Sequence, residues 1–143
     1  MTVGWILRQK GRHVVSALPD TPLGDVLKSL AKNRIGAVVI TDSNHKIVGI
    51  ISERDVVRIL AEDGSSALTR KAADVMTRTV VTCTDHHSVD WVMGEMTANR
   101  FRHMPVVEMG RLSGIVSIGD VVKYKLAMAE AEADQMRQYI ATG

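Results

Sequence analysis

An internal repeat is the feature that most constrains the fold of this chain of 143 residues. The segment Asn33–Ile40 returns as Asn99–Val106, 66 positions later, and Gly49–Val57 returns as Gly114–Val122, 65 positions later. The one residue lost between the blocks indicates a shorter turn in the second copy. Because both blocks recur in the same order, we expect two units of one architecture.

Each copy predicts the order β-α-β-β-α, so the chain is expected to be an α+β protein. Thr21 and Pro22 are typical of an N-cap followed by proline at the first helical position, and Ser52 is expected to cap the second helix. The remaining elements expected in the first copy are strands at 14–16, 37–41 and 46–51, helices that start near 22 and 52, and a linker at 63–66. The predicted units are residues 1–66, residues 67–125 with the linker, and a C-terminal extension at 126–143.

The second helix of copy two is predicted to run on from Ile118 to Ile140. Apolar residues recur there at steps of three and four, which marks one helical face. The members of this stripe are Val122, Leu126, Ala129, Ala133, Met136 and Ile140. The stripe can pack on its own domain, or it can pair with the same helix of a second subunit in a homodimer.

Composition excludes several classes of function. The chain is 45% hydrophobic and 24% charged with a net charge of +2, so it is globular, and neither a nucleic-acid nor a membrane footprint is expected. A single cysteine, Cys83, and the lack of a signal-peptide core favour the cytoplasm. His86 and His87 are adjacent and lack partners at ligand spacing, so no metal site is expected. No catalytic constellation is visible, and the protein is expected not to be an enzyme.

A Ser-x-x-Asp pattern occurs twice, as Ser52 with Asp55 and as Ser117 with Asp120. Each pair spans a predicted helix start, where free amides and the helix dipole favour an anion. An aspartate there can accept both hydroxyls of a ribose. The same spacing also forms a capping box, in which serine and acid satisfy the amides of the helix itself. Both roles can hold together.

At these residues the sequence resembles a known family. Gly49–Asp55 and Gly114–Asp120 are similar to the closing motif of cystathionine β-synthase (CBS) domains, and Arg102–Val107 resembles the second-strand motif of that family. The resemblance implies two repeats related by a pseudo-two-fold axis with two clefts between them, often assembled as dimers. It also implies regulatory ligands such as AMP, ADP, ATP, NAD(H) or S-adenosylmethionine, with no obligatory cofactor.

The resemblance further implies that each cleft takes its aspartate from one repeat and phosphate contacts partly from the other. The Asp55 cleft would draw on Arg102 and His103. The Asp120 cleft would draw on Arg54 and on the backbone around Gly36 and Ala37 of the first copy. Gly119 holds the position in copy two that Arg54 holds in copy one. Adenine would rest against one of two short strands, formed by Val14, Val15 and Ser16 or by Val80, Val81 and Thr82.

Less specific roles stand beside these assignments. Arg34, Arg54 and Arg100 can instead belong to solvated helix faces, and His103 can be a surface histidine with satisfied hydrogen bonds. Arg102 in the second copy corresponds to Gly36 in the first copy. The two clefts therefore cannot be equivalent, and they are expected to differ in affinity or ligand.

The sequence therefore predicts a module that binds an adenine nucleotide and signals energy or redox state to an unknown protein partner. The alternative is a structural dimerisation adaptor, whose clefts are vestigial and whose C-terminal helix is the working surface.

Overall fold

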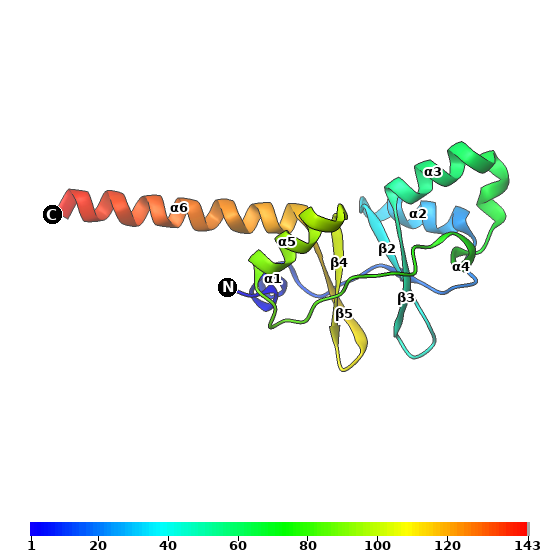
Figure 1. The fold of residues 1–143 in the computed structure, drawn as a ribbon, viewed down its shortest axis with the longest axis horizontal. Coiled ribbons are helices and arrows are strands. Elements are labelled where there is room, and N and C mark those ends of the chain that lie inside the picture. Colours follow the sequence, from blue (N-terminus) through cyan, green and yellow to red (C-terminus); the bar gives the residue numbers. More distant parts are fainter. Residues whose placement is uncertain (143) are drawn as a thin grey trace.

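The computed structural model describes residues 1–142 and shows two small sheets side by side, with helices around them (Figure 1). Its first half contains α1 (Val3–Lys10), β1 (Ser16–Ala17), α2 (Leu23–Asn33), β2 (Ala37–Thr41), β3 (Ile47–Ser52) and α3 (Glu53–Asp63). Its second half contains the 3₁₀ helix η1 (Gly64–Thr69), α4 (Ala72–Val75), α5 (Val89–Asn99), β4 (His103–Glu108), β5 (Arg111–Ser117) and α6 (Ile118–Thr142). The expected α+β class with two repeats is confirmed.

The two sheets repeat one topology. In the first, β1 pairs in parallel with β2, and β2 pairs antiparallel with β3. In the second, β4 and β5 are antiparallel, and the place of β1 is taken by a parallel bridge between Cys83 and Val106. Both hairpins shift register at equivalent points, after Ile40 and after Val106. The repeat in the sequence is thus also a repeat of strand pairing and of the register shift within each hairpin.

The lost residue does shorten the second hairpin. Residues 42–46 connect β2 to β3, whereas only Met109 and Gly110 connect β4 to β5. Both of these have positive φ, at 52° and 76°, as two-residue hairpins with a matching twist require.

Two local expectations in the first repeat are corrected. The first strand is Ser16–Ala17 rather than 14–16. The N-cap of α2 is Pro22 in an extended conformation, and Thr21 does not cap it. Tertiary hydrogen bonds explain the second difference, because the amide of Leu23 donates to the carbonyl of Arg70 at 2.8 Å and needs no side-chain cap.

The expected linker at 63–66 is also corrected. Asp63 is still the last residue of α3, and the following residues form η1 rather than an open loop. Ser66 and Thr69 each donate a side-chain hydrogen bond to the backbone carbonyl three residues earlier, which closes these tight turns.

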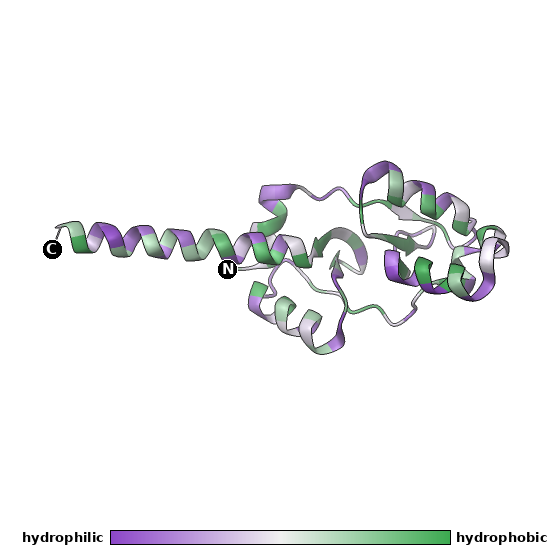
Figure 2. Cartoon of the chain, turned by 90° about the horizontal axis from the view of Figure 1, so that it is seen from above, coloured by the Kyte–Doolittle hydropathy of each residue, from purple (hydrophilic) through white to green (hydrophobic). Residues whose placement is uncertain are grey.

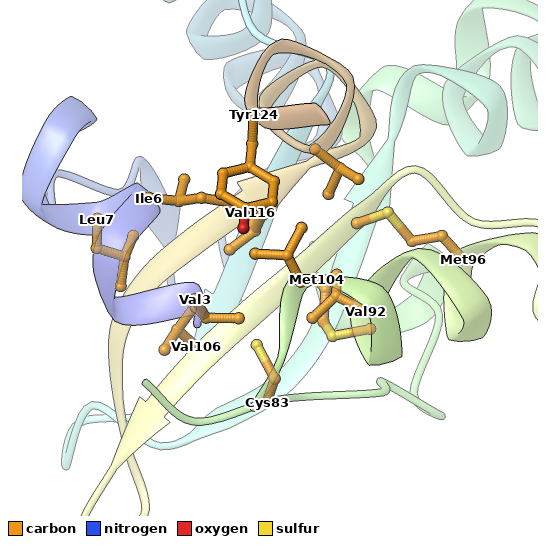
Figure 3. Packing of buried hydrophobic residues seen from close by; sticks show 12 residues of the cluster. Val3, Ile6, Leu7, Cys83, Val92, Met96, Met104, Val106, Val116 and Tyr124 are labelled. Carbon is orange, nitrogen blue, oxygen red and sulfur yellow. The ribbon is translucent and has the colours of Figure 1, made fainter. Parts of the chain in front are cut away.

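Each repeat has its own hydrophobic core. The first is built from α2, β2, β3 and α3, with Leu23, Val26, Val38, Ile40 and Ile51 fully buried. The second surrounds Met104 and Val106 of β4, and Figure 3 shows Cys83 and Val92 packed there together with Leu7 of α1. The N-terminal helix thus packs in the core of the second repeat, although it precedes the first. The boundaries of the three predicted units stay a prediction.

Helices α1 and α4 are equivalent elements, each leading into one repeat and packing on the sheet of the other. The first amides of the two helices donate matching hydrogen bonds. The donors are 69 positions apart in the sequence, whereas the acceptors are 66 apart, as the repeated strands are. These bonds are Val3 to His87 and Gly4 to Asp85 for α1, and Ala72 to Thr21 and Ala73 to Pro19 for α4. The pseudo-two-fold arrangement therefore includes a leading helix that the sequence did not reveal, and this helix is eight residues long in α1 but four in α4.

Helix α6 leaves the body of the molecule and projects away from it (Figure 1). Its first turns are anchored by the buried residues Val121 and Tyr124. Beyond Met128 every residue described is exposed, including Met136 at 59% and Ile140 at 72%. The predicted helix is confirmed, and the alternative in which the stripe packs on its own domain is wrong. Along this helix apolar and polar residues alternate (Figure 2).

Candidate functional site

Both Ser-x-x-Asp pairs are capping boxes. In the first, Ser52 Oγ accepts from the amide of Asp55 at 3.3 Å, and Asp55 Oδ2 accepts from the amide of Ser52 at 2.9 Å. In the second, the bond to Ser117 Oγ is 3.1 Å and the bond to Asp120 Oδ2 is 2.8 Å. Each aspartate spends one oxygen on its own helix, so only Oδ1 is left free of the capping box.

A cavity of about 410 Å³ opens beside Asp55 and is shared by both repeats. The first repeat contributes the end of β3 and the start of α3, and the second contributes the chain before α5 and the start of β4. The predicted residues that line it are Gly36, Ser52, Arg54, Asp55, Val80, Val81, Arg102 and His103. This set joins a carboxylate, basic side chains and aliphatic walls in one space large enough for a small molecule.

The charge in this cavity is predominantly positive. Arg54, Arg100 and Arg102 line it against two acids, Glu53 and Asp55. Arg54 and Gly36, which were expected at the Asp120 cleft, thus lie on the Asp55 side. Arg100 is exposed, as expected for a solvated position, and it also lines the cavity, where it follows α5 in a left-handed conformation with φ of 57°.

The ring of His103 lies against Gly36. A Cβ atom at Gly36 would come within 2.8 Å of His103 Cε1, so a side chain there would force the ring to move. Burial lowers the pKa of His103 below its ordinary value, and Glu53 and Asp120 only partly oppose this effect. The pKa of His103 thus stays below its ordinary value although a carboxylate of each repeat favours the charged imidazole.

The surroundings of Asp120 are different. Lys10 Nζ, at the end of α1, donates to Asp120 Oδ2 at 2.7 Å and to the carbonyl of Ile115 at 2.9 Å. Burial acts to raise the pKa of Asp120, but hydrogen bonds from Lys10 and Ser117 outweigh burial and leave it below the usual value. A smaller cavity of about 250 Å³ adjoins Asp120 and is lined otherwise by α1 and α6, including Trp5, Lys123 and Tyr124.

The remaining predicted residues lie outside both cavities. Val14 and Val15 are half-buried, and Val15 accepts a backbone hydrogen bond from Val39. Ala37 is buried within β2, where it pairs with Ser52. The others, Ser16, Thr82, Ser117, Gly119 and Arg34, are exposed or half-buried and are not among the residues of either cavity. The structure thus brings together residues predicted for the Asp55 cleft in one cavity, but it does not bring together those predicted for the Asp120 cleft.

Several residues of these sites were not found by sequence reasoning. Thr77, Thr79 and Phe101 line the Asp55 cavity, and Thr77 Oγ1 lies 3.5 Å from Asp55 Oδ1. Lys10 belongs to α1, which lies outside the repeated blocks of the sequence. The sequence held a weak signal for Thr77 and Thr79, because they directly precede the predicted adenine-binding residue Val80. No local pattern connects Lys10 to Asp120, which lies 110 positions away.

The buried cysteine is not an activated thiol. Burial raises the pKa of the Cys83 thiol to about 12, so it stays protonated at neutral pH and is a poor nucleophile. Among residues 1–142, no three side chains of the His, Cys, Asp or Glu type are grouped to hold a metal ion. Within the same range no helix combines the length and the apolar character needed to cross a membrane.

Comparison with known proteins agrees with this geometry. The family model described as CBS domain matches residues 11–62 and 72–127. The CBS-domain containing protein ATU1752 from Agrobacterium tumefaciens has 44% identity and a TM-score of 0.84, covering 87% of this chain and 99% of its own. The CBS domain protein PAE2072 from Pyrobaculum aerophilum, complexed with AMP, has 29% identity and a TM-score of 0.75, covering 84% and 89%. The CBS domain pair of protein MJ0100, in complex with 5-methylthioadenosine and S-adenosyl-L-methionine, has 27% identity and a TM-score of 0.80, covering 90% and 98%.

Proposed function

The chain belongs to the CBS domain family, and from this premise we propose that it is a regulatory module that binds an adenine nucleotide in the Asp55 cavity and catalyses no reaction. The observation that carries this proposal is the cavity itself, in which Asp55, three arginines and aliphatic walls from two repeats converge. Two solved relatives contain AMP or S-adenosyl-L-methionine with 5-methylthioadenosine, and all of these ligands share an adenosine unit.

Each part of a nucleotide has a counterpart in the cavity. The ribose hydroxyls are assigned to Asp55, whose Oδ1 is not used by the capping box. The phosphate is assigned to the arginine side, with Arg102 and the start of α3, because the guanidinium fork and free helix amides both suit phosphate oxygens. Adenine is assigned to Val80 and Val81, which offer an aliphatic wall. This arrangement favours a phosphorylated ligand such as AMP, ATP or NAD(H).

Binding would act on the relation between the two repeats. Since the acid comes from the first repeat and Arg102 from the second, a nucleotide bound to both favours the arrangement in which they are close. A partner protein that contacts one arrangement better than the other would then read nucleotide concentration. The identity of that partner, the choice among nucleotides and a location in the cytoplasm stay predictions.

The test is calorimetric titration of nucleotide-free protein with AMP and with adenosine. We expect Asp55→Ala to weaken AMP binding by about a hundredfold, because two hydrogen bonds to a charged group are lost. Asp63→Ala is the matched control, since it removes an ion-paired aspartate from the far end of the same helix, outside the cavity. Absence of AMP binding by folded wild-type protein, or equal binding by both variants, would contradict the proposal.

The exposed part of α6 favours a second, compatible role in assembly. We propose that it pairs with α6 of a second copy. Its exposed turns carry Met136, Tyr139 and Ile140 at 59%, 74% and 72% exposure, apolar and aromatic side chains that a second copy would cover. Met136→Glu is expected to convert the dimer to a monomer in light scattering with AMP binding intact. A monomeric wild-type protein would contradict the pairing and also the adaptor alternative.

A further inference from the structure

We propose that His103 couples nucleotide binding in the Asp55 cavity to the uptake of a proton, so that a phosphorylated ligand binds more tightly as the pH falls toward about 6. This inference rests on the proposed function and adds a form of regulation to the same site. The same concentration of nucleotide would then occupy a larger fraction of the protein at the lower pH.

The ring of His103 lies where the phosphate is assigned. A Cβ atom at Gly36 would be 2.8 Å from His103 Cε1 and 3.0 Å from Nε2, so the ring packs directly on Gly36. The carbonyl of Gly36 accepts from the amide of Glu53, the first residue of α3, at 2.9 Å. The imidazole is therefore fixed beside the start of α3, and Arg102 precedes it in the chain.

The ring nitrogens of His103 are available to a ligand. Within residues 1–142 no hydrogen bond to either nitrogen is found, and no side-chain nitrogen that lacks a partner is fully buried there. His87 differs, because its Nδ1 accepts from the amide of Thr84 at 2.9 Å. Since His103 lines the cavity, a ligand inside can reach the ring. A protonated imidazole donates from both nitrogens, so protonation adds one donor for phosphate oxygens.

In the free protein the surroundings disfavour the charged ring. Burial is the main cause of the lowered pKa of His103, and two cations act in the same direction, Lys10 of α1 and the adjacent Arg102. Two carboxylates oppose them, Glu53 of α3 and Asp120 of α6. Acids and bases around the ring are thus equal in number, and burial decides the direction. At pH 7.5 the free protein therefore holds mainly the neutral imidazole.

A bound phosphate changes this balance. A phosphate monoester carries about two negative charges near pH 7, and in the cavity it would lie among Arg54, Arg100, Arg102 and the imidazole. A negative charge within about 4–6 Å of an imidazole raises the pKa of the ring. Because the pKa is then higher with ligand than without it, binding takes up a proton. The affinity therefore rises as the pH falls from the higher pKa to the lower one, and above the higher pKa the effect vanishes.

The equivalent position in the other half carries no titratable group. His103 corresponds to Ala37 and Gly36 corresponds to Arg102, both at an offset of 66. Ala37 is buried in β2, where it pairs with Ser52. The contact between Gly36 and His103 therefore has no titratable counterpart at the start of α6, and the coupling is a property of the Asp55 cavity.

The experiment is calorimetric titration of nucleotide-free protein with AMP at pH 7.5 and pH 6.0. Two buffers with different enthalpies of ionisation are used at each pH, which gives the number of protons taken up. The wild type is compared with His103→Gln, which keeps a hydrogen-bond donor but cannot become charged. His86→Gln is the matched control, because it removes an exposed histidine outside the cavity.

We expect the ratio of wild-type affinity to His103→Gln affinity to rise by about three- to tenfold from pH 7.5 to pH 6.0, since one linked proton allows at most about tenfold per pH unit. The ratio cancels the proton that AMP itself takes up, because both proteins bind the same ligand. His86→Gln should behave as the wild type does. With adenosine, which has no phosphate, the ratio should not change with pH.

Proton NMR of the wild-type imidazole gives a second measurement that needs no variant. The titration midpoint of His103 should rise when AMP saturates the protein. A constant affinity ratio for AMP, or a midpoint that AMP leaves unchanged, would overturn the inference and leave the proposed function standing. A ratio that changes with pH for adenosine would also overturn it, because the ring would then respond to the base or the ribose. Wild-type protein that binds no AMP at either pH would overturn the inference and the proposed function together.

Discussion

The two halves of this molecule carry the same motif in two different settings. Asp55 and Asp120 are both the third residue of a helix, both close a capping box, and both follow a strand that pairs in the same register. Beside Asp55 lies an open cavity of about 410 Å³, whereas Asp120 accepts a hydrogen bond from Lys10 and adjoins a smaller cavity of about 250 Å³. Equal motifs therefore do not imply equal sites, because a motif sets the local geometry and distant residues decide what can reach it.

The element that creates the difference is α1. It buries Val3, Ile6 and Leu7 in the second core, whereas the shorter α4 buries only Ala72 and Val75 in the first. The longer helix buries more apolar surface, and this packing fixes the position of its last residue, Lys10. Two changes test this comparison. One weakens the packing of α1 by truncating Leu7, and the other follows the titration of His103, whose ring lies against Gly36 of the other repeat.

The largest effect is expected from removing the anchor of α1. Leu7→Ala should lower the free energy of unfolding by about 2–5 kcal/mol, since Leu7 is 1% exposed and its truncation leaves a cavity in the core. Met76→Ala is the matched variant in the other half and should cost less, because Met76 is half-buried. Urea denaturation of both measures the difference. Equal losses would show that α1 and α4 are anchored alike.

A smaller effect is expected from His103, which takes the place of Ala37 in the repeat. Its folded-state pKa lies below 6.5, so above pH 6.5 both states are neutral and its contribution to stability is complete. As the pH falls below 6.5 the unfolded state takes up the proton first. Stability is then lost by at most about 1.4 kcal/mol per pH unit until the folded pKa is reached.

Urea denaturation at pH 7.5 and pH 5.5 checks this expectation. The wild type should lose more stability between the two pH values than His103→Gln does. His86→Gln, which removes an exposed histidine, serves as the control. An identical pH dependence in wild type and His103→Gln would show that burial does not disfavour the charged imidazole.

Much of the fold was readable because it is local or repeated. The two copies, the capping residues Ser52 and Ser117 and the length of α6 follow from spacings of three to seven residues. The first strand and the start of α2 were misplaced, since tertiary hydrogen bonds override local preference: the amide of Leu23 donates to the carbonyl of Arg70, and the amide of Val39 donates to the carbonyl of Val15. Of the candidate site, the Asp55 cavity was assembled from predicted residues, while Thr77, Phe101 and Lys10 were missed.

By itself, the sequence determined that two similar units exist and that each presents an aspartate at a helix start. The first fact follows from the repeated blocks, and the second from hydrogen bonds between residues three apart, which any chain with that pattern can form. Only the tertiary structure decided what surrounds each aspartate. The surroundings of Asp120 include an ion pair between α1 and α6, which forms because packing of Leu7 against Gly114 brings the end of α1 to Asp120. Packing over such a separation leaves no trace in local spacing.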